Sequence, residues 1–253
     1  DKYKKKTLRL GDLLHLDKPH IQSRLKTMLE YKNLELGGCY HQAPMSYPAL
    51  LSWCEKKAEQ FAPYITDTGN YIAAALSNHQ KVVLEAQLGA MRDIDYGIFP
   101  YTSSSSTISA YGPIGAGIPG TLPDHIIGVL KAYSTCVGAG PFTAEKAMPE
   151  KWMESLRKSG GEYGAATGRP RRVGPFDAVA SAYGLKCQNA DKIALTKLDV
   201  LSHMDEIPVI TSYKLNDEII TEFDPLDDLD SMTPVIQMLP GWNTDISKCR
   251  KYE

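Results

Sequence analysis

Three arginines lie close together in a glycine-rich stretch that runs from Gly160 to Gly174. They are Arg169, Arg171 and Arg172. Glycine lets the backbone turn tightly and approach a ligand closely, and the planar guanidinium group donates paired hydrogen bonds to carboxylates and phosphates. The stretch is therefore typical of a loop that closes on an anion, although a solvated basic loop would have the same composition.

A second group of charged residues follows an apolar run, 192–196, that predicts a buried strand. Lys197 comes directly after this run, and Asp199 comes two residues later. A carboxylate can accept hydrogen bonds from both N1–H and the 2-amino group of guanine, whereas adenine offers no such pair of donors. The stem of a lysine can lie along the purine ring. The pattern indicates a guanine site, but an ion pair at an exposed strand end is its commoner use.

A run of hydroxyl side chains, Thr102–Thr107, has the composition of a phosphate-binding loop. Hydroxyls and backbone N–H groups bind phosphate where they gather in a loop that opens a helix. A flexible linker fits the composition equally well. The fingerprints G-x-x-x-x-G-K-[ST] and G-x-G-x-x-G do not occur in the sequence.

The composition limits the classes of function. The chain has 253 residues, is 43% hydrophobic and carries a formal net charge of -2, which favours neither nucleic acid nor an anionic membrane as a partner. The five cysteines are widely spaced and include no C-x-x-C pair, and the six histidines form no metal-binding pattern. No apolar run reaches the roughly 18 residues of a membrane span. We therefore expect a cytoplasmic protein with reduced thiols and no metal ligands within this chain.

The apolar periodicity predicts helices that alternate with short strands. This alternation is typical of an α/β fold with a mainly parallel sheet flanked by helices. We expect a single domain over 1–253, with a helical segment at 19–80 and a sheet-containing segment at 81–253. Expected helices cover 19–33, a segment starting at Ser46 and Pro48, a segment capped by Thr66 or Thr68, 149–158, and 178–187 with Asp177 as its cap. Expected strands cover 81–85, 126–133, 192–196 and 207–213, and 214–223 is an expected hairpin with its turn at Asn216 and Asp217.

Four ordered blocks of the sequence resemble the adenylosuccinate synthetase family: Lys131–Thr135 with Gly138–Phe142, Gly161–Val179, Leu195–Val200 and Leu239–Trp242. The resemblance extends from Asp1 to about Trp242. It implies that family's fold in an incomplete form, similar to the fold of P-loop nucleotide hydrolases. It also implies the family's reaction, in which GTP phosphorylates the 6-oxygen of IMP and the amine of L-aspartate displaces the phosphate, with Mg²⁺ as cofactor.

The resemblance assigns the glycine-arginine stretch to aspartate binding. Arg169 would hold the aspartate carboxylate and touch the IMP ribose, and Arg171 would lie between aspartate and GTP. Ala166 stands where many family members have a second threonine, so one hydroxyl contact would be missing. The implied aspartate-binding residues are Ala165, Ala166, Thr167, Gly168, Arg169 and Arg171.

Other matches imply an IMP site and a GTP site. Ser103 matches a threonine that binds the IMP phosphate, and Leu88 stands where the family has an IMP-binding glutamine, with Gln87 one position early. Lys5 takes the place of an arginine that reaches the IMP phosphate of the neighbouring subunit, which implies a homodimer. The implied IMP-binding residues are Ser103, Gln87, Leu88, Arg169 and Lys5, and the implied GTP-binding residues are Arg171, Lys197, Leu198 and Asp199.

Part of the family's machinery has no counterpart in the sequence. Its phosphate loop, its catalytic Asp and His and its Mg²⁺ contacts would lie upstream of Asp1, and a further nucleotide-contacting loop would lie downstream of Glu253. We therefore expect a piece of a longer ligase that turns over little or no substrate by itself. Two alternatives stay open: a viral relative that uses dGMP in place of IMP, and a non-catalytic nucleotide-binding or assembly module. Asp199 favours GTP over ATP as the phosphoryl donor.

Overall fold

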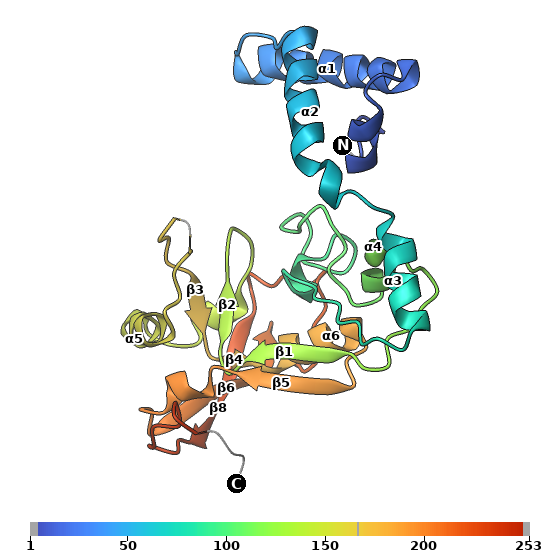
Figure 1. The fold of residues 1–253 in the computed structure, drawn as a ribbon. Helices are drawn as coiled ribbons and strands as arrows, with labels where there is room; N and C mark the ends of the chain where they lie inside the picture. The colour runs from blue at the N-terminus through green and yellow to red at the C-terminus, as the bar shows by residue number, and fades with distance from the viewer. Residues whose placement is uncertain (1–4, 166, 250–253) are drawn as a thin grey trace. The chain divides into compact units, whose positions relative to one another are not determined.

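The computed structural model describes residues 5–165 and 167–249 (Figure 1). The chain divides into two compact units, Asp1–Gln80 and Lys81–Glu253. The first unit is helical, and the second contains the strands that the described residues form.

Helices and short 3₁₀ turns form the first unit. Pro19 stands in the first turn of its helix, where the missing N–H is not needed, and Ser46 caps the next helix by accepting a hydrogen bond from the Ala49 N–H at 3.4 Å. Both predicted helix starts are confirmed. The core contains Leu16, Ile21, Leu25 and Cys54. The elements are η1 (Leu10–His15), α1 (Pro19–Tyr40), α2 (Tyr47–Phe61), η2 (Ala62–Tyr64) and α3 (Thr68–Ser77).

Two boundaries in this unit differ from the prediction. Helix α1 continues beyond its predicted end near residue 33 and stops where His41 adopts a left-handed conformation, with φ 52° and its N–H bonded to the Leu36 carbonyl. Helix α3 is capped by Asp67 rather than by either threonine, because the Asp67 carboxylate accepts the Asn70 N–H at 3.0 Å.

The second unit combines parallel and antiparallel strand pairs. Strand β1 pairs with β5 in parallel, β2 pairs with β3 antiparallel, and β6 pairs with β4 in parallel and with β7 and β8 antiparallel. The α/β class, the strands predicted at 126–133, 192–196 and 207–213, and the hairpin at 214–223 are confirmed. The helical and 3₁₀ elements are η3 (Ala90–Arg92), α4 (Tyr111–Ala116), η4 (Thr143–Lys146), α5 (Glu150–Gly160), α6 (Ala178–Gln188) and η5 (Leu198–Leu201). The strands are β1 (Ile127–Lys131), β2 (Ser134–Cys136), β3 (Arg172–Gly174), β4 (Phe176–Asp177), β5 (Lys192–Thr196), β6 (Glu206–Leu215), β7 (Glu218–Ile220) and β8 (Thr233–Pro240).

The strand predicted at 81–85 is wrong. The segment has no ladder partner among the described residues, and Val83 is 90% exposed. An apolar, β-branched run forms a strand only where a neighbouring strand can pair with it. Strand β8 was not predicted either. It pairs antiparallel with β6, with a register shift between Ile210 and Ser212.

A buried carboxylate joins α6 to β6. The predicted cap is confirmed, because Asp177 Oδ1 accepts the Ala180 N–H at 3.0 Å. Asp177 Oδ2 accepts the hydroxyl hydrogen of Tyr213 in β6 at 2.7 Å, and both side chains are buried. Burial raises the pKa of the Asp177 carboxyl above its usual value.

Strands β1 and β5 run side by side (Figure 1). Gly128 of β1 lies directly against Leu185 of α6, so that a Cβ atom at this position would overlap the leucine side chain. Parallel strands are usually covered on both faces. Here four apolar side chains of the pair remain exposed: Ile127, Val129, Ile193 and Leu195.

Candidate functional site

Residues 161–171 form a loop that leaves the end of α5 and returns at the start of β3 (Figure 1). Gly161, with φ 64°, ends the helix in a left-handed conformation that glycine adopts easily. Tyr163 and Pro170 form an isolated antiparallel bridge, and the Gly164 N–H donates to the Arg169 carbonyl at 2.8 Å. These bonds fold the loop into a narrow hairpin.

The tip of this loop carries most of the residues implied in aspartate binding. Ala165, Thr167 and Gly168 are exposed, and Gly168 has φ 65°. The Arg169 N–H donates to Thr167 Oγ1 at 3.4 Å. Ala166 lies outside the described residues.

The three arginines of this stretch differ in their surroundings. The exposed guanidinium of Arg169 makes no hydrogen bond or ion pair with any residue that the structure describes. Arg171 Nη1 bonds to Glu162 Oε2 at 2.8 Å. Arg172 is bound to both carboxylate oxygens of Glu145 and donates to the Gly140 carbonyl at 2.7 Å. Arg172 therefore holds the fold together, and the other two arginines face the site.

Glu162 is a buried acid at the base of the loop. Its Oε1 accepts hydrogen bonds from Lys131 Nζ at 2.8 Å and from the Tyr133 hydroxyl at 2.7 Å, while its Oε2 binds Arg171. Burial alone would raise the pKa of Glu162, but the three donors together lower it below its usual value. Burial and the bond to Glu162 raise the pKa of Tyr133. The acid is thus held ionised and fully paired.

The residues implied in guanine recognition follow β5, as expected. Lys197 has φ 63°, and its ammonium donates to the carbonyl of Gly160, the last residue of α5, at 3.2 Å. Leu198 packs against the core. Asp199 lies exposed in the first turn of η5, and its charge contributes to the raised pKa of Tyr133. Lys197 and the arginine loop therefore meet at the end of α5.

The hydroxyl run 102–107 belongs to a compact loop. Buried Asp93, with 0% of its surface exposed, accepts the N–H groups of Asp95 and Tyr96 at 2.9 and 3.0 Å and that of Thr107 at 2.6 Å. Burial would raise the pKa of Asp93, but these N–H donors lower it. Ser103 Oγ lies 3.1 Å from the Ser105 carbonyl oxygen, to which it donates. This degree of order argues against a flexible linker.

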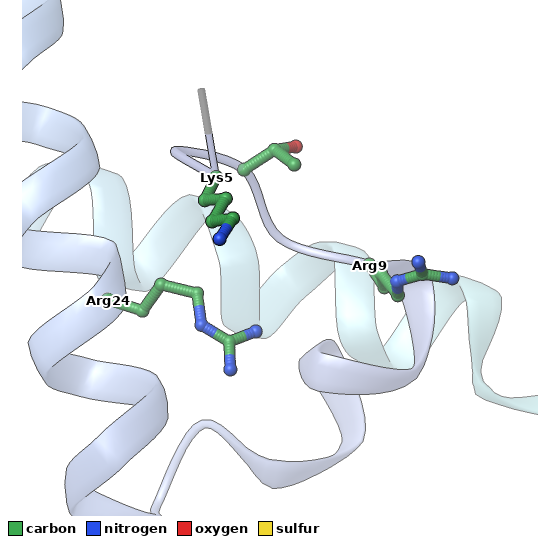
Figure 2. Close-up of a pocket in the computed structure, with 4 residues that line it drawn as sticks. Lys5, Arg9 and Arg24 are labelled. Atoms are coloured by element: carbon green, nitrogen blue, oxygen red, sulfur yellow. The ribbon is translucent and has the colours of Figure 1, made fainter. Parts of the chain in front are cut away.

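A basic cavity lies in the first unit, lined by Lys5, Thr7, Arg9 and Arg24, with a volume of about 560 Å³. Figure 2 shows the side chains of Lys5 and Arg24 directed toward the same space. Asp12 accepts from Arg24 Nη1 at 2.9 Å and from the Arg9 N–H at 2.8 Å. Three of the four lining residues are basic, and of these only the Arg24 side chain is paired with Asp12 among the described residues, so the lining suits an anion.

Comparison with known proteins decides the family. The sequence model described as adenylosuccinate synthetase matches residues 1–253. The chain belongs to the adenylosuccinate synthetase family. It is 38% identical over 256 residues to an adenylosuccinate synthetase of Koribacter versatilis, with 100% of this chain and 57% of that relative covered. It is 40% identical over 252 residues to that of Carboxydothermus hydrogenoformans, with 99% and 58% covered.

A solved structure supports the adenylosuccinate synthetase fold. The fully ligated adenylosuccinate synthetase of Plasmodium falciparum matches with a TM-score of 0.85 at 30% sequence identity. The match covers 98% of this chain and 58% of that one. The chain thus spans less than three fifths of the length of these relatives.

The backbone turns sharply near two of the residues that were expected to lie in an IMP site. Leu88 adopts a left-handed conformation, with φ 75°, and is exposed, as is Gln87. Gly89 follows with φ 91°. A leucine has no polar atom to bind a nucleotide, and two successive positive φ values turn the backbone sharply at this point.

Sequence reasoning missed one residue that shapes the site, Arg92. Its guanidinium donates to Cys136 Sγ at 2.8 Å, to the carbonyls of Val137 at 3.0 Å and Ala139 at 3.2 Å, and to the carbonyl of Tyr101. It ties the loop before the hydroxyl run to the loop after β2. The only signal in the sequence is a charged residue beside the apolar Ala90–Met91 pair.

Neither a metal-binding cluster nor a membrane-spanning helix occurs among the described residues. No group of three or more His, Cys, Asp or Glu side chains is placed to hold a metal ion. No described helix has both the length and the apolar character that a bilayer crossing needs.

Proposed function

We propose that this chain forms the aspartate-binding and guanine-binding part of a GTP-dependent ligase that joins IMP to L-aspartate. In that reaction the phosphoryl group passes from GTP to the 6-oxygen of IMP. The aspartate amine then attacks C6, the purine carbon that carries this oxygen. A C–N bond forms, and the bond between C6 and the phosphorylated oxygen breaks, so that phosphate leaves. Such chemistry depends on positioning and on stabilising the charge of the transferred group.

The observation that carries the proposal is that Lys197 and the loop of Arg171 are both attached at the end of α5. Lys197 binds the Gly160 carbonyl, and Glu162, two residues further along, binds Arg171. Lys197, whose stem can lie along a purine ring, and Arg171, which can bind a carboxylate or phosphate, thus share one support. A scaffold protein has no need for this combination, which disfavours a purely structural role.

Each group has a proposed task. Asp199 accepts the two N–H donors of guanine, with Lys197 and Leu198 beside the base. Arg169, unpaired within the described residues, and Arg171 bind the aspartate carboxylate, with Ala165, Thr167 and Gly168 in the same loop. Ser103 contacts the IMP phosphate.

The basic cavity of the first unit has a proposed task in a dimer. Lys5, Arg9 and Arg24 give it a positive charge that suits a phosphate. We propose that Lys5 reaches the IMP phosphate of a second copy of the chain, so that the working form is a homodimer. A lysine supplies the charge without the paired hydrogen bonds of an arginine.

The described residues do not fit a magnesium site, because they offer no cluster of carboxylates. Mg²⁺ therefore has no assigned ligand in this chain. The sequence also contains no G-x-x-x-x-G-K-[ST] loop. We propose that residues 1–253 alone bind nucleotide but turn over little or none, in a cytoplasmic enzyme.

The test is nucleotide binding by Asp199→Asn. Isothermal titration calorimetry of the chain with GTP should show about a 100-fold loss of affinity, the equivalent of two hydrogen bonds to a charged acceptor. Xanthosine triphosphate should bind the variant better than GTP does, because xanthine carries a carbonyl oxygen where guanine has its amino group. Asp205→Asn is the matched control, since Asp205 is also an exposed acid nearby in sequence.

Turnover is measured on the protein as its gene encodes it. Formation of adenylosuccinate from IMP, aspartate and GTP is expected, with dGMP tested in place of IMP. Equal GTP affinity of the two variants would contradict the guanine assignment. GTP binding without any turnover would favour the non-catalytic alternative.

A further inference from the structure

Glu162 is the most enclosed acid of the site, with 1% of its surface exposed. Its three donors come from separate parts of the chain: Lys131 from the end of β1, Tyr133 from the turn that follows, and Arg171 from the residue before β3. Burying a carboxylate costs several kcal/mol unless such donors compensate it. An apolar side chain would fill this place at lower cost if packing were its only task.

Arg171 is bound to Glu162 at two points. The Arg171 N–H donates to the Glu162 backbone carbonyl at 2.9 Å, and Arg171 Nη1 donates to Glu162 Oε2 at 2.8 Å. Two attachment points fix both the position of the residue and the direction of its side chain. A guanidinium has five N–H donors, so most remain available to a ligand.

The cations beside Glu162 are more accessible than the acid itself. The side chains of Lys131 and Arg171 are 29% and 33% exposed, against 2% for that of Glu162. The three groups together carry one net positive charge. Glu162 thus fixes the positions of Lys131 and Arg171 without cancelling their combined positive charge.

We propose that Glu162 is a positioning residue, which holds the Arg171 guanidinium in place for the anionic substrate. This inference rests on the proposed function. Arg169 makes no comparable contact within the described residues, so the positioning role applies to Arg171 alone.

The test is Glu162→Gln in the protein as its gene encodes it. Glutamine has the same size and still accepts from Lys131 and Tyr133, but its amide nitrogen turns a donor toward Arg171. The KM for aspartate should rise about tenfold, as expected for the loss of one charge-assisted hydrogen bond, while the KM for IMP stays unchanged. Glu162→Asp keeps the charge and should raise the KM for aspartate less.

The chain provides a matched control in Asp177→Asn. Asp177 is the other buried acid that accepts a hydrogen bond from a buried tyrosine hydroxyl, and it lies in the joint between α6 and β6. This variant should leave the KM for aspartate unchanged. Hydrogen exchange gives a readout apart from activity: Glu162→Gln should speed exchange of the Arg171 amide but not of amides in β5.

The outcomes separate the two proposals. A wild-type protein that forms no adenylosuccinate overturns the proposed function. An active wild type in which neither Glu162 variant changes the KM for aspartate overturns the positioning role alone. An equal loss of melting temperature in Glu162→Gln and Asp177→Asn, without a change in KM, also overturns it, because the role would then be purely structural.

Discussion

Replacing Gly160 with alanine tests the packing under the candidate site. A methyl group at Gly160 would meet the Tyr133 hydroxyl oxygen well inside van der Waals contact, and would lie 3.1 Å from Tyr133 Cζ and 3.3 Å from Glu162 Cγ. Tyr133 is buried, so its hydroxyl must leave Glu162. Losing a hydrogen bond to a charged group costs about 1.5–3 kcal/mol, and alanine regains about 1 kcal/mol of helix propensity. We expect Gly160→Ala to lower the free energy of unfolding by about 0.5–2 kcal/mol.

A double-mutant cycle with Tyr133→Phe isolates the cause. The phenylalanine variant loses the same hydrogen bond and should cost about 1.5–3 kcal/mol. In that background the added methyl group no longer meets a hydroxyl, and its other neighbours need to shift by only a few tenths of an ångström. The gain in helix propensity then offsets these small shifts, so Gly160→Ala should be close to neutral, which gives a coupling energy of about 0.5–2 kcal/mol.

The assay is urea denaturation of the four proteins, followed by tryptophan fluorescence, to which Trp152 contributes from the edge of this core. Unchanged slopes of the free energy against urea would show that the variants unfold from comparable states. An equal cost of Gly160→Ala in both backgrounds would refute the reasoning, since the damage would then not pass through the Tyr133 hydroxyl.

Two further predictions concern the buried acids. Asp177→Asn keeps the helix cap and a partner for Tyr213 while removing a charge that burial disfavours, so its thermal stability at neutral pH should match or exceed that of the wild type. Asp177→Ala should lower the free energy of unfolding by about 1–3 kcal/mol. Equal melting temperatures of the two variants would contradict this prediction. Glu162 and Asp93 have lowered pKa values, so their contribution to stability is present above the ordinary carboxyl pKa of about 4 and is lost as the pH falls through the lower folded values. Denaturation midpoints should therefore decline from about pH 5 to about pH 3, and Glu162→Gln should make the decline shallower; an identical profile for this variant would argue against a paired, ionised Glu162.

Local chemistry made part of the fold predictable. Asp177 precedes an apolar run, and a carboxylate at that position satisfies the first N–H groups of a helix, so the start of α6 could be predicted. The same rule does not select the right cap where several capping residues are neighbours. Thr66, Asp67 and Thr68 can all cap a helix, and the structure uses Asp67 for α3. Pairing is not local, and for that reason the segment around Val83 was misassigned and β8 was not recognised.

The site was predictable by residue type but not by role. The three arginines of the loop look alike in the sequence, yet Arg172 is tied to Glu145, Arg171 to Glu162, and Arg169 to no side chain among the described residues. A glutamate in a glycine-rich stretch usually indicates a solvated loop. Only the fold shows that β1, the turn after it and the start of β3 supply its three donors.

The parallel pair β1 and β5 has a consequence for handling the protein. Ile127, Val129, Ile193 and Leu195 give this ribbon water-exposed apolar side chains on both of its faces. Exposed apolar surfaces of this kind promote association, and an unpaired strand edge beside them can form a β-ladder with another chain. We therefore expect the isolated chain to aggregate or to form reversible oligomers at high concentration. Low protein concentration, low temperature and a mild detergent should favour its purification.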